Sequence, residues 1–205
     1  MQVAALKQTS PEHVAVLLSD GGDVRSTLSV ITELRLFVGK ELDAPTLSEL
    51  RLLSRRALSR ERALAIVSRR PHSCKELRDK LTQKGEDETD ADYCVEWLRE
   101  HGFLDDARYA AQIVRHYAGK NYGAGRIRAE LSRRGIDRDL WDEAFTELPE
   151  ADDKLDRFIA ARLKDADDPS QVQKVSNALL RRGYSWEQIR GALRRYCDTI
   201  EEEST

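Results

Sequence analysis

Several features that mark membrane proteins and secreted scaffolds are scarce in this chain. No apolar run approaches the roughly 18 residues that a membrane-spanning helix needs. Residues 1–10 lack the basic-then-apolar layout of a signal peptide. Aromatic residues make up 6% of the 205 residues, whereas charged residues make up 35%. We therefore expect a protein of the cytoplasm with no membrane segment, modest cores and a heavily charged surface.

Cysteine is also scarce. Cys74, Cys94 and Cys197 are odd in number and widely spaced, which argues against a disulfide framework. His72 lies near Cys74 and His101 follows Cys94 by seven residues, but there is no C-x-x-C pair. Zinc sites use tighter ligand spacing than this. We expect reduced, partly buried thiols and no metal site.

Motifs that carry catalysis are missing as well. The segment 119–125 has three glycines but lacks the preceding strand and the Lys-Ser/Thr ending of a phosphate-binding loop. Asp105 and Asp106 are better explained as the start of a helix, where acidic side chains accept from free amides and offset the dipole. We therefore expect no catalytic residue, no cofactor and no enzymatic activity.

What the sequence does contain is an internal repeat. Gly85, Gly135 and Gly183 stand 50 and 48 residues apart, and each closes a phrase that begins with leucine, at Leu81, Leu131 and Leu179. Another aliphatic residue precedes each leucine by four positions, which places both on one face of a short helix. The glycine is the residue that most readily adopts the left-handed conformation ending such a helix.

The apolar pattern continues on both sides of these phrases. After each glycine, four apolar residues recur at matching offsets and form one face of a further helix: Ala91, Cys94, Val95 and Leu98; Trp141, Ala144, Phe145 and Leu148; Ile189, Ala192, Leu193 and Tyr196. Before each phrase lies another helix, over Ala57–Val67 in the first copy. Tyr109, Ala110, Ile113, Val114 and Tyr117 mark it in the second copy, and Leu155, Phe158, Ile159 and Leu163 in the third.

The predicted fold is therefore all-α, with three tandem three-helix repeats in a curved solenoid and a small N-terminal β-hairpin segment. In the hairpin, the aliphatic run 13–18 pairs with the β-branched run 27–31 across the turn at 20–22, and a short helix follows near 46–53. Capping boxes are expected at Ser73 with Glu76 and at Ser185 with Gln188. The expected divisions are 1–56 for the hairpin and short helix, 57–104, 105–149 and 150–198 for the repeats, and 199–205 for an acidic tail, which we expect to be frayed over 201–205.

Charge is unevenly distributed along the chain, although the net charge is −3. Segment 51–70 has seven Lys or Arg against one acid, segment 115–134 has six against one, and segment 136–150 has six acids against one Arg. The balance disfavours a generic polyanion binder. Alternating basic and acidic faces are typical of a protein that docks on a charged partner, and also of ordinary solvated helices.

Three stretches of the sequence resemble the RecX family of recombinase regulators. They are ALAIVSRRPHS at 63–73 followed by Glu76-Leu77, GFLDD at 102–106 followed by Tyr109-Ala110, and GAGRIRAEL at 123–131 followed by RGI at 134–136. The third repeat matches by pattern. One departure is Glu86, which stands where the family usually has an apolar residue after the first repeat's glycine.

The resemblance implies a curved all-α module that binds the RecA filament on single-stranded DNA. Such proteins limit filament growth, ATP hydrolysis, strand exchange and the co-protease activity of RecA, and so act in DNA repair and the SOS response. On this basis the expected partner is the RecA filament, with single-stranded DNA as a further contact, and we expect a monomer.

The candidate contact residues lie on the basic surface of the short repeated helices and their neighbours. They are Lys75, Lys80, Lys84, Arg115, Lys120, Tyr122, Arg126, Arg128, Arg133, Arg134, Arg181 and Arg182. Two other functions stay open on the sequence: a single-stranded nucleic-acid-binding module that acts without direct RecA contact, and a helical scaffold for an unrelated partner. Steep salt dependence of binding to DNA alone distinguishes the nucleic-acid module.

Overall fold

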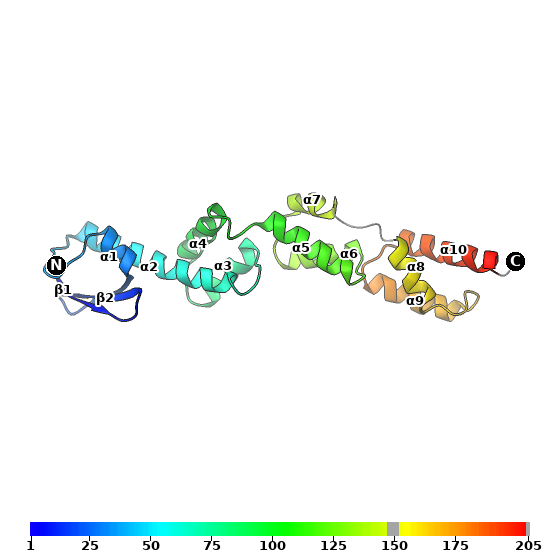
Figure 1. Ribbon diagram of the computed structural model, residues 1–205, viewed down its shortest axis with the longest axis horizontal. Helices are drawn as coiled ribbons and strands as arrows, with labels where there is room; N and C mark the ends of the chain where they lie inside the picture. The colour runs from blue at the N-terminus through cyan, green and yellow to red at the C-terminus, as the bar shows by residue number, and fades with distance from the viewer. Residues whose placement is uncertain (147–151, 204–205) are drawn as a thin grey trace. The chain divides into compact units, whose positions relative to one another are not determined.

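The chain is predominantly helical, with a small sheet at its N-terminus (Figure 1). The computed structural model describes residues 1–146 and 152–203 and divides into two compact units, Met1–Leu104 and Asp105–Thr205. The expected core residue Leu148, the link residue Pro149 and the end of the tail, 204–205, lie outside the described residues. The all-α repeat fold is confirmed, whereas the curvature of the array stays a prediction.

The N-terminal sheet has three antiparallel strands in the order β1-β2-β3, one more than the expected hairpin. They are β1 (Val3–Gln8), β2 (His13–Leu18) and β3 (Asp23–Thr27). The turn between β2 and β3 is closed by Asp20, whose carboxylate accepts from the Gly22 amide at 3.0 Å. The Leu18 amide donates to the Gly22 carbonyl at 2.8 Å. An Asx side chain that mimics a backbone turn in this way is typical of tight reversals.

The predicted second strand of the hairpin, 27–31, was wrong. Because the turn follows β2 directly, His13 pairs with Thr27 and Leu17 with Asp23, so the partner of β2 is 23–27 and not 27–31. From Leu28 the chain forms the short helix α1 (Leu28–Glu33). The β-branched side chain of Val30 is buried in the core although it belongs to a helix and not to a strand.

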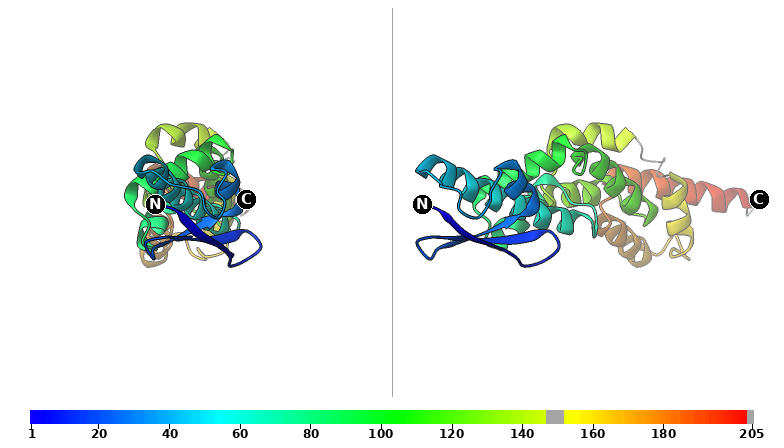
Figure 2. Two further views of the ribbon diagram at one scale, coloured as in Figure 1. Left: turned by 90° about the vertical axis from the view of Figure 1, so that its left-hand side faces the viewer. Right: turned by 60° about the vertical axis from the view of Figure 1, so that its left-hand side comes forward.

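A single 24-residue helix, α2 (Ala44–Val67), replaces the two helices expected near 46–53 and 57–67. It begins at Asp43, whose carboxylate accepts from the Thr46 amide at 2.9 Å, and no Gly or Pro interrupts it after Pro45. The expected division between 56 and 57 therefore falls inside a continuous helix. Figure 2 shows the sheet lying beside the first part of this helix.

The three repeats each contain three helices. The first repeat uses the second half of α2 with α3 (Cys74–Gln83) and α4 (Glu88–Glu100). The second consists of α5 (Asp106–Gly119), α6 (Ala124–Arg133) and α7 (Trp141–Thr146), with a 3-10 turn, η1, at Arg138–Leu140. The third consists of α8 (Asp152–Ala160), α9 (Pro169–Arg181) and α10 (Trp186–Glu203). Helix α10 continues to Glu203, so the expected tail from residue 199 begins inside that helix.

The middle helix of every repeat ends in the same way. Gly85, Gly135 and Gly183 have φ of 88°, 66° and 87°. In each case the next amide donates to the leucine carbonyl five positions earlier, at 3.1, 3.1 and 3.2 Å. The glycine's own amide donates to the carbonyl three positions earlier, at 2.9, 2.9 and 2.8 Å. These two bonds define a Schellman motif and satisfy carbonyls that the helix end would leave unpaired.

Each repeat encloses its own apolar core, built from the stripes that the sequence predicts. The first core contains Ala63, Leu77, Leu81, Ala91, Cys94, Leu98 and Leu104. The second contains Tyr109, Ala110, Ile113, Val114, Ala118, Ile127, Leu131, Ile136 and Ala144. The third contains Leu155, Phe158, Ile159, Leu163, Val175, Leu179, Tyr184, Ile189 and Ala192. A fourth core lies between the sheet, α1 and the first half of α2. The expected capping boxes at Ser73 and Ser185 are both present.

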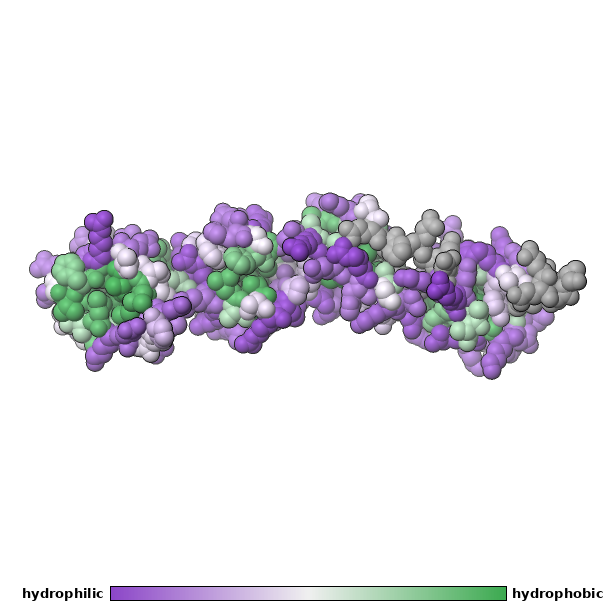
Figure 3. Space-filling model, viewed as in Figure 1, coloured by the Kyte–Doolittle hydropathy of each residue, from purple (hydrophilic) through white to green (hydrophobic). Residues whose placement is uncertain are grey.

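Apolar side chains also remain on the surface. Figure 3 shows them gathered over the N-terminal part of the first unit, where Leu28, Phe37 and Val38 are exposed. The remaining surface in this view is dominated by hydrophilic residues.

The buried Leu81 side chain provides a test of the repeat core. We expect Leu81→Ala to lower the free energy of unfolding by about 2–5 kcal/mol, because it leaves a cavity between three helices. Leu28→Ala removes the same atoms from an exposed position of the same unit, and should change stability by roughly 0.5 kcal/mol or less. Urea unfolding of both variants checks this; equal losses would contradict the assigned core.

Candidate interface on the basic faces of the repeats

The twelve expected contact residues divide between the two units. Lys75, Lys80 and Lys84 lie on or directly after α3 in the first unit. The other nine lie on or beside α5, α6 and α9 in the second unit: Arg115, Lys120, Tyr122, Arg126, Arg128, Arg133, Arg134, Arg181 and Arg182. The residues of the second unit come from two repeats that the fold holds in direct contact.

Backbone hydrogen bonds join the second and third repeats. The Gly123 amide donates to the Arg182 carbonyl at 2.8 Å, and the Gly125 amide donates to the Gly183 carbonyl at 2.9 Å. A Cβ at position 123 would lie 2.5 Å from the Gly183 oxygen, and a Cβ at 183 would overlap the backbone of Arg126. Only glycine permits an approach this close. The start of α6 is therefore fixed against the end of α9.

Arg182 stabilises this junction from within. Its guanidinium donates to the carbonyls of Lys120 and Asn121, both at 3.2 Å, just after the C-terminal end of α5. It also lies over the rings of Tyr122 and Phe158, at 5.5 and 5.0 Å from their centroids. A cation at a helix C-terminus offsets the partial negative charge there. The structure thus gives Arg182 internal partners, unlike the contact role expected from the sequence.

Three cations beside the junction have no partner among the described residues. Lys120, Arg126 and Arg181 are exposed, and within the described residues their side chains make no hydrogen bond or ion pair. All three lie within three residues of the glycine contact. We call them the junction cluster. Tyr122 is half-buried, with its ring 5.5 Å from that of Tyr117, which packs on the core as expected.

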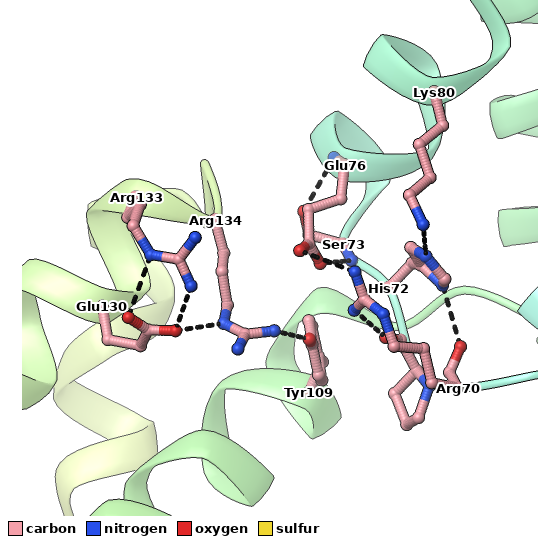
Figure 4. A network of polar contacts seen from close by, with 10 residues as sticks. Arg70, His72, Ser73, Glu76, Lys80, Tyr109, Glu130, Arg133 and Arg134 are labelled. Carbon is pink, nitrogen blue, oxygen red and sulfur yellow. Dashed lines mark hydrogen bonds and ion pairs between the residues drawn. The ribbon is translucent and has the colours of Figure 1, made fainter. Parts of the chain in front are cut away.

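A buried carboxylate organises the arginines at the end of α6 (Figure 4). Glu130 accepts from Arg133 at 2.6 and 3.0 Å and from Arg134 Nε at 2.8 Å. Arg134 also donates to the Tyr109 hydroxyl. The hydrogen bonds from Arg133, joined by those from Arg134, lower the pKa of Glu130 to about 2 against the opposing effect of its burial.

The two arginines of this network differ in what they present to solvent. The Arg133 side chain is 67% exposed, whereas that of Arg134 is 19% exposed. Arg133 is therefore held in place by Glu130 and still faces outward, while Arg134 serves the fold. Arg115 and Arg128 are exposed, and Arg128 lies over the Phe145 ring at 4.9 Å.

The lysines of α3 are less alike than the sequence suggests. Lys80 donates to Nε2 of the buried His72 at 2.9 Å, while His72 Nδ1 donates to the Arg70 carbonyl at 2.8 Å (Figure 4). Burial lowers the pKa of His72, in keeping with a neutral ring that accepts from an ammonium group. Lys75 pairs with Asp79 at 2.6 Å, and Lys84 is exposed beyond the helix end.

The basic segment 51–70 is largely neutralised by its own unit. Arg55 and Arg56 face the buried Asp90 of α4, and Arg62 pairs with Glu86, which also accepts from the Ser59 hydroxyl. Glu86 therefore occupies its unusual position by pairing with α2. Several arginines of this basic run therefore form ion pairs between helices and do not belong to a free basic surface.

A further basic and aromatic face was missed by the sequence reasoning. Trp186, Arg190 and Arg194 lie at i, i+4 and i+8 on α10, and all three are exposed. Neither arginine pairs with another side chain in the part of the chain that the structure describes. The apolar periodicity of α10 drew attention to Ile189, Ala192 and the other core positions, although the i, i+4 spacing on the opposite face was also readable.

No cluster of His, Cys, Asp or Glu that could hold a metal ion occurs among residues 1–146 and 152–203. The three thiols are free, and burial raises the pKa of Cys94 to about 11. None of the described helices is both long and apolar enough to cross a membrane.

Three family models match the chain, one for each repeat. They are described as the first, second and third three-helix domains of RecX, and they match residues 60–98, 105–144 and 160–193.

Curated relatives and solved structures agree with these matches. "Regulatory protein RecX" of Vibrio campbellii is 36% identical over 158 residues, which is 75% of this chain and 95% of that protein. The protein of the same name from Shigella boydii is 37% identical over 151 residues, 67% of this chain and 91% of that protein. A crystal structure titled regulatory protein RecX superposes with a TM-score of 0.72 at 25% identity, covering 92% of this chain and 97% of that one. RecX from Lactobacillus salivarius has the same fold, with a TM-score of 0.62 and 21% identity over 69% of this chain and 96% of that one.

Gly183→Ala tests the close approach at the junction. Gly85→Ala is a matched control, because φ is 88° there and 87° at Gly183, yet a Cβ at 85 has no atom within 4 Å. The control should cost about 1–2 kcal/mol for the left-handed backbone. We expect Gly183→Ala to cost more and to increase hydrogen exchange of the Gly123 and Gly125 amides. Equal unfolding free energies would contradict the contact.

Glu130→Gln tests the carboxylate that organises Arg133 and Arg134. Since the pKa of Glu130 is about 2 in the folded chain and its ordinary value is 4.5, the ionised form stabilises the fold at neutral pH. This contribution, on the order of 2–3 kcal/mol, is present above the ordinary pKa and is lost as the pH falls from 4.5 toward 2. The variant should lose it at neutral pH and show a flatter acid dependence in urea unfolding. The exposed Glu143→Gln is the control, and an unchanged profile for Glu130→Gln would overturn the assignment.

Proposed function

The chain belongs to the RecX family of regulatory proteins, and from that premise we propose that it binds the RecA filament on DNA and mainly inhibits it. The regulator acts without catalysis of its own. By occupying the filament it limits ATP hydrolysis, strand exchange and co-protease activity.

The junction cluster is the observation that carries this proposal. Lys120, Arg126 and Arg181 are exposed and unpaired within the described residues, beside a junction that two backbone hydrogen bonds hold rigid. Cations held on a rigid support lose little conformational entropy when they bind an acidic protein surface or a phosphate. The outward-facing Arg133 extends the same basic surface along α6.

A second candidate function is binding of single-stranded nucleic acid without direct RecA contact. The exposed face of Trp186, Arg190 and Arg194 favours it, because an aromatic ring next to arginines suits base stacking and phosphate binding. The net charge of −3 weighs against it, since phosphate binding gains most from overall positive charge.

The deciding experiment titrates the chain into the single-stranded-DNA-dependent ATPase reaction of RecA, well below one molecule per RecA. Binding of the same DNA without RecA is measured alongside at two salt concentrations. Inhibition at substoichiometric levels with feeble DNA binding supports the filament regulator. Unchanged ATPase activity together with tight, salt-sensitive DNA binding supports the nucleic-acid module instead.

Charge reversal of the junction cluster should separate this surface from the rest of the chain. We expect Lys120→Glu with Arg126→Glu and Arg181→Glu to weaken inhibition at least tenfold, about 1.4 kcal/mol or more, with unchanged helix content. Arg134 and Arg182 are left intact because they hold the fold together. The matched control reverses Lys7, Arg51 and Arg69, three exposed cations of the first unit that pair with no side chain among the described residues. Equal inhibition by the two triple variants would refute the site.

A further inference from the structure

A stack of aromatic rings lies open to solvent at the end of α4 in the first unit. The Trp97 and His101 rings are 4.1 Å apart at an interplanar angle of 27°. The Trp97 and Phe103 rings are 6.3 Å apart at 16°, and the Arg60 guanidinium lies 5.2 Å from the Trp97 ring centroid. None of these residues is among the expected contacts, and none belongs to the junction cluster. We call these four residues the ring stack.

The backbone explains why Phe103 faces outward. Gly102 has φ of 72°, and the amides of Phe103 and Leu104 both donate to the Leu98 carbonyl, at 2.8 and 3.2 Å. This turn directs Leu104 into the core, where it is buried, and leaves the Phe103 ring 54% exposed. The larger apolar side chain of the pair is therefore the one kept in water, at the cost of its hydrophobic transfer free energy.

The orientation of the ring stack is fixed before any partner arrives. His101 Nδ1 donates to the Trp97 carbonyl at 2.7 Å, so the imidazole is held against the indole. Trp97 itself is half-buried and packs on the first core. A partner that covers Phe103 would meet a surface whose rings need little reordering, which is the property of an interface anchor.

The charges around the ring stack decide the kind of partner. Arg60 and Arg99 are balanced by Glu96 and Glu100, and Arg99 pairs with Glu96 at 2.9 Å. Phosphate binding gains nothing from a locally neutral surface, so a nucleic-acid strand is disfavoured. The centres of protein interfaces are depleted in net charge and enriched in aromatic residues and arginine.

We propose that the ring stack is a protein-docking anchor in which Phe103 enters an apolar pocket of the partner. The proposal rests on the proposed function, because the partner protein it names is the RecA filament. It assigns to the first unit an apolar contact, complementary to the cationic contact of the second unit. The two contacts differ in their response to salt, since screening weakens interactions between charges and leaves apolar burial largely unchanged.

The test compares Phe103→Ala with Phe37→Ala, because Phe37 is 60% exposed in the same unit and no ring of the described residues stacks on it. Binding of the full chain to RecA filaments on single-stranded DNA is measured at low and high salt. We expect Phe103→Ala to raise the Kd about tenfold at both salt concentrations and Phe37→Ala to leave it within about twofold. Phe103→Leu, which keeps an apolar side chain, should lie between them.

Each other outcome overturns a distinct part of the argument. Wild-type binding together with equal binding by Phe103→Ala, or equal losses in both alanine variants, refutes the anchor and leaves the proposed function standing. Weaker binding of Phe103→Ala to single-stranded DNA without RecA would reassign the ring stack to a nucleic acid. A wild-type chain that binds no filament refutes the proposed function and the anchor together.

Discussion

The fold depends on a helix stop that recurs once per repeat. A glycine with positive φ and two backbone hydrogen bonds end α3, α6 and α9, and the next residue turns back toward the core. Ile136 and Tyr184 are buried at that next position, and Glu86 is nearly so. Without the stop, each middle helix would continue outward and the following helix would not reach its core. In the third repeat the same glycine also forms the contact with the second repeat, so one residue type sets both helix length and repeat packing.

Much of this could be predicted from the sequence, because it is encoded locally. The leucine-to-glycine phrases, the apolar stripes and the capping boxes each involve residues within a few positions of one another. The boundaries failed where contacts distant in sequence decide the outcome. Strand β1 forms because β2 offers an edge to it, and α2 runs unbroken because its first half packs on the sheet and its second half on the first repeat.

The candidate site shows the same division between local and distant information. Arginine content identified the basic segments, yet the role of each arginine depends on what lies opposite it in space. Arg55, Arg56 and Arg62 face acids of their own unit, and Arg182 binds carbonyls that lie 61 and 62 positions earlier in the chain. A run of basic residues in the sequence does not reveal either kind of pairing. Charge patterning therefore identifies the basic segments but does not separate cations with internal partners from exposed ones.

The separation matters for how such a regulator is built. An arginine that binds a helix end or a buried carboxylate fixes the local backbone. Neighbouring residues then present their charges to solvent from that fixed backbone. Arg182 supports the junction cluster in this way, and Glu130 holds Arg133 while Arg134 faces inward. Because the supporting and presenting residues are adjacent in sequence, a loss of binding on substitution would not by itself tell them apart. Stability measurements distinguish them, since only loss of a supporting residue also lowers the free energy of unfolding.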